Sequence, residues 1–208
     1  DTPAAAFTVR LDHADPATGK VFAFARRSRA ALAALSVEPP GQCKARSLSQ
    51  TPPDAISMAR ADALGLEAPG RGLIQPGETD IFGRMALEFA FGKISSSVIH
   101  LESGFPEQWA AYRAGGALTA ASAVLEARLI FRRFPQAGEG YVVRSGLSAV
   151  SEKIRTLTHW VCDPETGAGL WSMEAVGCLL DLQTCRRKPV EPDTLAQMRR
   201  HVVQGLAP

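Results

Sequence analysis

The chain has 208 residues, of which 46% are hydrophobic and 21% are charged, and its formal net charge at pH 7 is +2. This composition supports a packed core in one large domain, or one and a half small ones, and it excludes a wholly disordered chain. The nearly balanced charge gives no electrostatic case for nucleic acid, and no apolar run approaches the roughly 20 residues that span a bilayer. We therefore expect neither a nucleic-acid nor a membrane partner.

The four cysteines predict free thiols. Cys43, Cys162, Cys178 and Cys185 form no Cys-x-x-Cys pair, and no Cys/His cluster has zinc-finger spacing. Cys162 and Cys178 lie in apolar, strand-like runs, where cysteine behaves as a small core residue. Free thiols are typical of a reducing compartment, so we expect a cytoplasmic protein.

The first 69 residues repeat parts of the C-terminal sequence in the same order. We therefore predict that residues 1–69 are the C-terminal part of a first repeat, with strands and a terminal helix, and that residues 70–208 form a complete domain. The matching pairs are Asp15-Pro16-Ala17-Thr18-Gly19 with Asp163-Pro164-Glu165-Thr166-Gly167, Pro53-Asp54 and Met58 with Pro192-Asp193 and Met198, and Gly65-Leu66-Glu67-Ala68-Pro69 with Gly205-Leu206-Ala207-Pro208.

The first copy has no counterpart of the strand, loop and helix that precede the shared turn in the second copy. Its apolar run 21–35 corresponds to 169–182 and is expected to form a strand, whose exposed edge a partner or second chain would cover. The alternative is a natural half-repeat that only extends the sheet.

Residues 78–101 carry most of the functional information. Asp80 lies three residues before Gly83, and residues 87–99 are apolar on most sides, which predicts a buried helix after Gly83 that reaches Leu101. A carboxylate beside a helix N-terminus suits acyl chemistry, because free N–H groups can hold an oxyanion while the carboxylate acts on the reacting carbon or on a water. The simpler interpretation is that Thr79 and Asp80 only cap the helix.

Apolar runs and turns alternate after this helix. Residues 163–167 form a strong turn, and the turn spacing is typical of a meander of antiparallel strands. A bulge is expected at Gly177, and a terminal helix capped by Asp193 is expected to reach Val203. The predicted strands are a short one near 72–76 and four long ones at 121–134, 140–150, 153–162 and 168–182.

Several motifs together resemble a known family. Thr79-Asp80-Ile81-Phe82-Gly83-Arg84-Met85 is similar to the Thr-Asp-x-x-Gly-His-Met/Val-Asn signature of hotdog acyl-CoA thioesterases of the 4-hydroxybenzoyl-CoA thioesterase type. Residues 132–139 resemble their strand-turn element, and Val143-Arg144-Ser145-Gly146 and His159-Trp160 follow at suitable distances. The resemblance covers about residues 70–190 and implies the α+β hotdog fold, a long buried helix wrapped by a curved antiparallel sheet. With the repeat, it implies a tandem double-hotdog protein whose first repeat is incomplete.

The resemblance implies a hydrolase of acyl-CoA or acyl-carrier thioesters that acts as a homodimer or a tandem pair. Asp80 is then the nucleophile or general base, the backbone N–H groups of Gly83 and Arg84 are the oxyanion donors, and Glu88 is a second candidate carboxylate. No metal is expected, and no cofactor beyond the coenzyme A of the substrate. The expected substrate-binding residues are Phe82, Met85, Arg132, Arg144 and Lys153.

The chain departs from the family signature at two positions. Arg84 and Ala86 stand where the signature has histidine and asparagine, which favours the alternative of a non-catalytic acyl-binding or structural hotdog module. A hotdog dehydratase or hydratase acting on enoyl or 3-hydroxyacyl thioesters is a further alternative. That chemistry pairs a histidine with a carboxylate, and the nearby His100 lies at the wrong end of the helix.

Overall fold

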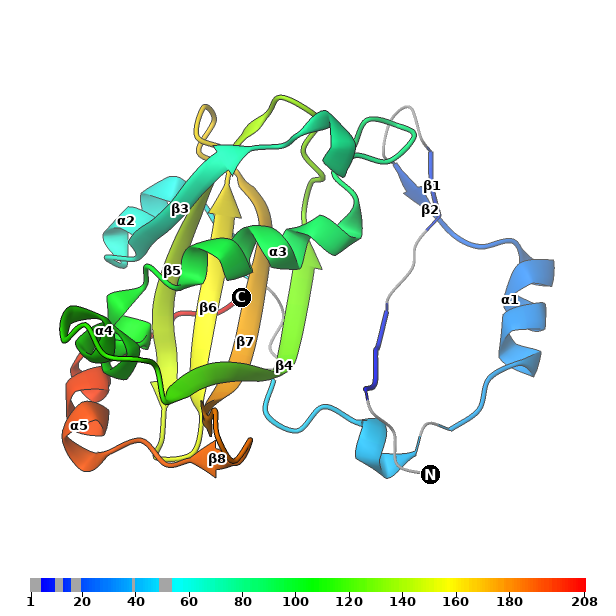
Figure 1. Cartoon of the computed structure of the whole chain (residues 1–208). Coiled ribbons are helices and arrows are strands. Elements are labelled where there is room, and N and C mark those ends of the chain that lie inside the picture. The colour runs from blue at the N-terminus through cyan, green and yellow to red at the C-terminus, as the bar shows by residue number, and fades with distance from the viewer. Residues whose placement is uncertain (1–4, 10–12, 16–19, 39, 49–53) are drawn as a thin grey trace. The chain divides into compact units, whose positions relative to one another are not determined.

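The computed structural model describes residues 5–9, 13–15, 20–38, 40–48 and 54–208, which fall into two compact units, Asp1–Arg46 and Ser47–Pro208 (Figure 1). The sequence places the boundary between its two repeats later, at residues 69 and 70. The origin of residues 1–69 in a first repeat stays a prediction.

None of the described residues in the first unit is buried. Strands β1 (His13–Ala14) and β2 (Val21–Phe22) pair antiparallel, and helix α1 (Arg26–Ala34) and the 3-10 turn η1 (Gly41–Cys43) follow. The strand expected over 21–35 therefore ends early. Alanine and arginine, which make up most of α1, are strong helix formers, and they override the strand expected from the repeat. The turn expected at residues 15–19 lies largely outside the described residues.

The second unit is built on one antiparallel sheet (Figure 1). The spatial order is β3-β5-β6-β7-β4, so β3 and β4 form the edges, and the short β8 pairs with the end of β7. Strands β5, β6 and β7 follow one another in both sequence and space, as predicted for a meander. The bounds are β3 (Glu67–Leu73), β4 (Ala120–Phe131), β5 (Gly140–Val150), β6 (Arg155–Cys162), β7 (Gly169–Asp181) and β8 (Arg187–Lys188).

The four long strands lie close to their predicted positions, whereas β3 begins before the strand expected near 72–76. The sequence of β3 contains two glycines and a proline and gives little strand signal, and its pairing with β5 defines it. A bulge occurs opposite Gly177, because Val124 pairs with Gly177 but Glu126 pairs with Val176. The extra residue is thus Leu125 of β4 rather than Gly177.

Helix α3 (Leu87–Val98) lies across one face of the sheet (Figure 1). It begins four residues after Gly83 because the intervening backbone is extended: Met85 N–H donates to Pro135 O over 2.8 Å, and Arg84 forms a bridge with Gln136. The other helical elements are α2 (Met58–Ala63), η2 (Pro76–Glu78), η3 (Glu102–Gly104), α4 (Pro106–Arg113) and α5 (Pro192–Arg200).

Helix α5 is capped differently from the prediction. Its N-cap is Glu191, and Pro192 takes the first helical position, where its missing N–H costs nothing, so Asp193 lies inside the first turn.

Among the described residues, no helix has the length and apolar character needed to cross a bilayer.

The main core lies between α3 and the sheet. Ala90 and Ile94 of α3 pack against Val143, Val161 and Trp171, which are all fully buried. Burial of each large side chain stabilises the fold by about 1.5–3 kcal/mol, which fixes the helix on this face. The prediction of a buried helix holds for the side of α3 that packs on the sheet, whereas its outer side is open to solvent, with Leu87 53% exposed. We call the covered side of the sheet the helix face; on β5 it carries Val143, Ser145 and Leu147.

The opposite side of the sheet, the outer face, carries Arg144 and Gly146 of β5. Two leucines from distant parts of the chain, Leu66 and Leu206, pack here with Trp160. A Cβ on Gly146 would lie 3.0 Å from Leu66 Cδ2 and 2.8 Å from Leu206 Cδ2, so any larger residue would displace these two methyl groups. All four cysteines are free, and Cys162 and Cys178 are buried, as predicted.

Candidate functional site

The loop that contains Asp80 is a short hairpin leading into α3. Asp80 N–H donates to Arg84 O over 2.7 Å, and Ala86 N–H donates to Glu78 O over 2.9 Å. The tip is a tight turn, closed by the Gly83 N–H bond to Asp80 O, in which Gly83 takes a φ of +73° that favours glycine. The hairpin therefore holds a carboxylate at a defined position beside the start of the helix.

The Asp80 carboxylate is exposed, and its two oxygens differ in their surroundings. Oδ1 accepts the backbone N–H groups of Phe82 over 2.8 Å and Arg84 over 3.0 Å. Oδ2 has no donor among the described residues. Asp80 thus holds the loop with one carboxylate oxygen and presents the other to solvent. The same side chain can therefore stabilise the turn and act on a substrate.

The predicted oxyanion donors are engaged within the loop. Gly83 N–H bonds to Asp80 O and Arg84 N–H bonds to Asp80 Oδ1, so neither is directed to a ligand in this conformation. At the start of α3, the N–H groups of Leu87 and Glu88 have no acceptor among the described residues, as is usual for the first helical turn. Sequence reasoning missed these donors because it began the helix too early. The Glu88 side chain, the second candidate carboxylate, is exposed in the same turn.

The hairpin tip is strongly apolar. Ile81 is 93% exposed and Phe82 60% exposed, and the Arg84 guanidinium lies 5.5 Å from the centre of the Phe82 ring. Met85, predicted to bind substrate, is instead only 1% exposed and belongs to the main core. The tip can therefore contact an acyl chain or a partner, whereas Met85 anchors the hairpin.

The three predicted substrate-binding cations are not gathered at the loop. Arg132 donates to Ser172 Oγ over 3.0 Å on the outer face of the sheet. Arg144, also on the outer face, is buried and donates to Leu66 O over 2.7 Å. Lys153 is exposed in the turn between β5 and β6. Arg132 and Arg144 hold the segment before β3 against the sheet, which is a structural role.

A half-buried ion pair links α3 to the base of the hairpin, and sequence reasoning missed it. Lys93 Nζ lies 2.5 Å from both carboxylate oxygens of Glu78, and the ammonium stands 5.4 Å from the Tyr141 ring centre. Burial alone would raise the pKa of Glu78, but the hydrogen bonds from Lys93 and the Gln75 N–H, with the Lys93 charge, hold this pKa below its usual 4.5. No short motif predicts a partner fifteen residues away across a loop.

A second polar contact lies in the core beneath α3. His159 Nδ1 is 2.8 Å from Ser145 Oγ, and both residues are fully buried. Burial lowers the pKa of His159 to about 4, so the imidazole is neutral near pH 7. Among the described residues, no three His, Cys, Asp or Glu side chains are arranged to hold a metal ion.

Solved structures similar to this chain are thioesterases or proteins of uncertain role. YbaW, a probable thioesterase from Escherichia coli, is 13% identical with a TM-score of 0.53, over 65% of this chain and 99% of that one. A putative thioesterase from Pseudomonas putida is 17% identical with a TM-score of 0.55, over 69% and 91%. SAV2348 from Staphylococcus aureus, solved in complex with CoA, is 14% identical with a TM-score of 0.53, over 69% and 88%. At these identities the likeness establishes the hotdog fold.

No curated protein matches the chain. The family described as Thioesterase-like superfamily matches residues 74–198, from the end of β3 to α5. This stretch contains the Asp80 hairpin, the central helix and all of the long strands. The chain therefore belongs to the Thioesterase-like superfamily.

Proposed function

We propose that this protein hydrolyses acyl-CoA thioesters at the Asp80 hairpin. The observation that carries the proposal is the exposed Asp80 carboxylate, with one oxygen free, on a hairpin that leads directly to the free N–H groups of Leu87 and Glu88. Membership of the superfamily supports thioester hydrolysis in general. The CoA held by the similar SAV2348 supports coenzyme A as the thiol.

The proposed reaction uses Asp80 as general base. A water oxygen attacks the thioester carbon while its proton passes to Asp80 Oδ2, and the Leu87 and Glu88 N–H groups, at the positive end of α3, stabilise the oxyanion. The C–S bond then breaks, and the proton on Asp80 returns to the leaving thiolate. Glu88 is the alternative base in the same turn.

The test is thiol release from a panel of short, medium, long and aromatic acyl-CoAs, with Asp80→Asn measured in parallel. Asparagine keeps an oxygen for the Phe82 and Arg84 N–H bonds but cannot take the proton, so we expect kcat to fall about 10²–10⁴-fold with the fold intact. Asp193→Asn, an exposed aspartate in α5, is the matched control and should retain activity. Activity that survives in Asp80→Asn but is lost in Glu88→Gln would move the base to Glu88.

The competing function is a non-catalytic module that binds acyl groups. It is supported by the engagement of the Gly83 and Arg84 N–H groups within the loop and by the Arg84 and Ala86 departures from the signature. A protein that binds acyl-CoA but releases no thiol from any member of the panel would establish this module and exclude the hydrolase.

We further propose that two copies pair along the edge of β4. Among the described residues, β7 is the strand that pairs with β4, and the Ser47 N–H also donates to Glu126 Oε2 of β4 over 2.8 Å. Val124 and Leu125 of β4 are 52% and 57% exposed, and an apolar edge strand is a template for another strand. Antiparallel pairing of two β4 strands by a two-fold axis would continue the sheet through both copies.

Descent from a tandem protein is proposed for residues 1–69, supported by three likenesses between the repeated segments. Gly65 and Gly205 both take positive φ, at +66° and +71°, and Leu66 and Leu206, which follow them, are buried in one cluster. Helices α2 and α5 precede the two glycines. The strands β1 and β2 pair antiparallel on either side of the first Asp-Pro-Ala-Thr-Gly segment, as β6 and β7 do around the second.

A further inference from the structure

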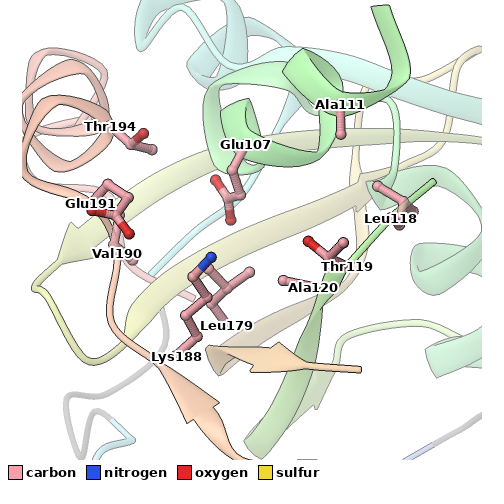
Figure 2. A pocket seen from close by; sticks show the side chains of 10 residues that line it. All are labelled: Glu107, Ala111, Leu118, Thr119, Ala120, Leu179, Lys188, Val190, Glu191 and Thr194. Atoms are coloured by element: carbon pink, nitrogen blue, oxygen red, sulfur yellow. The ribbon is translucent and has the colours of Figure 1, made fainter. Parts of the chain in front are cut away.

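A cavity of about 160 Å³ lies at the end of β4 opposite the Asp80 hairpin. Figure 2 shows its side chains, which come from α4, the start of β4, the end of β7, and β8 with the start of α5. The polar groups come from two carboxylates, one ammonium and two hydroxyls: Glu107, Glu191, Lys188, Thr119 and Thr194. The apolar walls include Leu118, Leu179 and Val190. Its volume is below the range of complete small-molecule pockets, so it suits one part of a longer ligand.

The Glu107 carboxylate has an unused acceptor in this cavity. Arg155, only 1% exposed, donates to Glu107 Oε1 over 2.5 Å and to Gly104 O over 2.6 Å. Glu107 Oε2 is buried and has no hydrogen-bond partner. A buried acceptor without a donor costs about 1–3 kcal/mol, which a ligand N–H directed at Oε2 would remove.

The Lys188 ammonium supplies a hydrogen-bond donor to the same cavity. Lys188 is half-buried on β8, where its backbone pairs with Leu179, and it forms no ion pair with a described residue. Figure 2 shows the Glu107 carboxylate and the Lys188 ammonium directed into the same cavity from α4 and β8. The unpartnered Glu107 Oε2 acceptor and the Lys188 donor, in a cavity that also has apolar walls, match a group with an N–H and a C=O between methylenes, which is a secondary carboxamide.

We infer that this cavity binds a carboxamide of the pantetheine arm of the thioester substrate, with the amide N–H on Glu107 Oε2 and the amide C=O on Lys188 Nζ. The inference rests on the proposed function, because pantetheine is the amide-containing arm that joins the CoA nucleotide to the thiol.

The cavity serves the reacting loop of a second copy. The twelve residues of β4 span about 40 Å, which is longer than one pantetheine arm, and they separate the cavity from the Asp80 hairpin of the same chain. In an antiparallel β4 pair, the C-terminal end of one strand lies beside the N-terminal end of the other. Pairing thus brings the hairpin of one copy, with its exposed Ile81 and Phe82, to the cavity of the other, whose rim carries the exposed Leu118.

The direct test is calorimetric titration of the full chain with pantetheine. Lys188→Met keeps the aliphatic stem but removes the donor, and we expect binding to weaken about tenfold, while Lys188→Arg restores most of it. Arg187→Met is the matched control: Arg187 is next to Lys188 on β8, is exposed and does not line the cavity, so binding should be unchanged. No binding to the unmodified chain, or equal weakening in Lys188→Met and Arg187→Met, overturns the inference.

A second variant tests the acceptor. Glu107→Gln replaces Oε2 or its neighbour by an amide nitrogen and should also weaken pantetheine binding. Because it removes the Arg155 ion pair, its unfolding is measured beside its binding. A folded Glu107→Gln protein that binds pantetheine as tightly as the unmodified chain contradicts the assignment of Oε2.

Kinetics separate this inference from the proposed function. For an acyl-CoA we expect Lys188→Met to raise KM about tenfold with kcat within about twofold, since the lost contact is made equally in the ground and transition states. An acyl ethanethiol thioester, which lacks the arm, should show no difference between Lys188→Met and the unmodified chain. If Lys188→Met lowers kcat without raising KM, the cavity assignment is contradicted, but the proposed hydrolysis of acyl-CoA is not. If no thioester is turned over, the proposed function fails, and the titration still decides whether the cavity binds pantetheine.

Discussion

Lys93 is the residue through which the central helix holds the Asp80 hairpin in place. Its contact with both oxygens of Glu78 fixes the base of the hairpin, and Ala86 N–H donates to Glu78 O at the same place. The side chains of Lys93 and Glu78 are only 12% and 20% exposed, so solvent screens the pair weakly. The pair lies away from Asp80, the proposed base, and anchors the hairpin that carries it.

We expect Lys93→Met to lower both stability and turnover. Methionine retains the aliphatic stem but leaves the Glu78 carboxylate without its cation, at a cost of about 1–2 kcal/mol in the free energy of unfolding. Looser positioning of Asp80 should lower kcat about tenfold with a smaller change in KM. Urea unfolding and acyl-CoA kinetics measure the two effects. The double variant Lys93→Met with Glu78→Gln is the control. If its loss in free energy of unfolding equals the sum of the losses in the two single variants, the two residues are not coupled.

His159 makes stability depend on pH in a defined window. Its pKa is about 4 in the folded protein and 6.5 in its ordinary state, so the unfolded chain binds the extra proton first as the pH falls. The contribution of the neutral His159 to the free energy of unfolding is therefore complete above pH 6.5. It is lost as the pH falls from 6.5 towards 4, at no more than about 1.4 kcal/mol per pH unit.

Denaturant unfolding at pH 7, 6 and 5 checks this expectation. His159→Gln should be less stable at pH 7, because Ser145 loses its fitted partner, but its stability should change little between pH 7 and 5. His201→Gln alters an exposed histidine and should retain the slope of the unmodified protein. A slope that persists in His159→Gln would assign the pH dependence to other groups.

Among the elements, β4 is the edge strand along which we propose that two copies pair. It is an edge strand with a bulge at Leu125, and its Val124 and Leu125 side chains are more than half exposed. We expect the unmodified chain to be a dimer by light scattering coupled to size exclusion, and Leu125→Lys to be a monomer, because a charge on an edge opposes strand pairing. Leu182→Lys, at a similarly exposed leucine just after β7, is the control. A dimeric Leu125→Lys protein would exclude this edge.

The long strands were predictable because their signal is local, whereas the start of α3 was not. In β6, alternation sends Leu157, His159 and Val161 to the helix face, and the bounding turns are evident in the sequence. Residues 84–86 resemble helix in sequence but are held extended by Pro135 and Gln136, some fifty residues later. Such a contact leaves no local pattern.

In the candidate site, too, the parts with a local sequence signal were predictable and the parts that depend on distant contacts were not. The Asp80–Gly83 turn followed from a short motif, whereas the free donors at Leu87 and Glu88, the Lys93 ion pair and the Glu107–Lys188 cavity depend on tertiary structure. Arg144 was expected to bind substrate, but its guanidinium donates to Leu66 O and forms an ion pair with Asp62.

At the scale of the whole molecule, the segment before β3 belongs to the fold of the second unit. Ile56, Ala61 and Leu66 are buried with Trp160 on the outer face, and the backbone oxygens of Asp54 and Leu66 accept bonds from Arg132 and Arg144. No described residue of the first unit, by contrast, is buried. The boundary that matters for stability is thus the one between Arg46 and Ser47.

Two truncations test this boundary. A chain of residues 47–208 should unfold with a free energy within about 1 kcal/mol of the full chain, because its core is complete. A chain of residues 67–208 should lose about 4 kcal/mol or more, since it exposes Trp160 and leaves the buried Arg144 without Leu66 O and Asp62. Urea unfolding followed by tryptophan fluorescence compares them, with Leu66→Ala in the 47–208 chain as an intermediate case. Equal stability of the two truncated chains would show that residues 47–66 only lie on a fold that is complete from β3 onward.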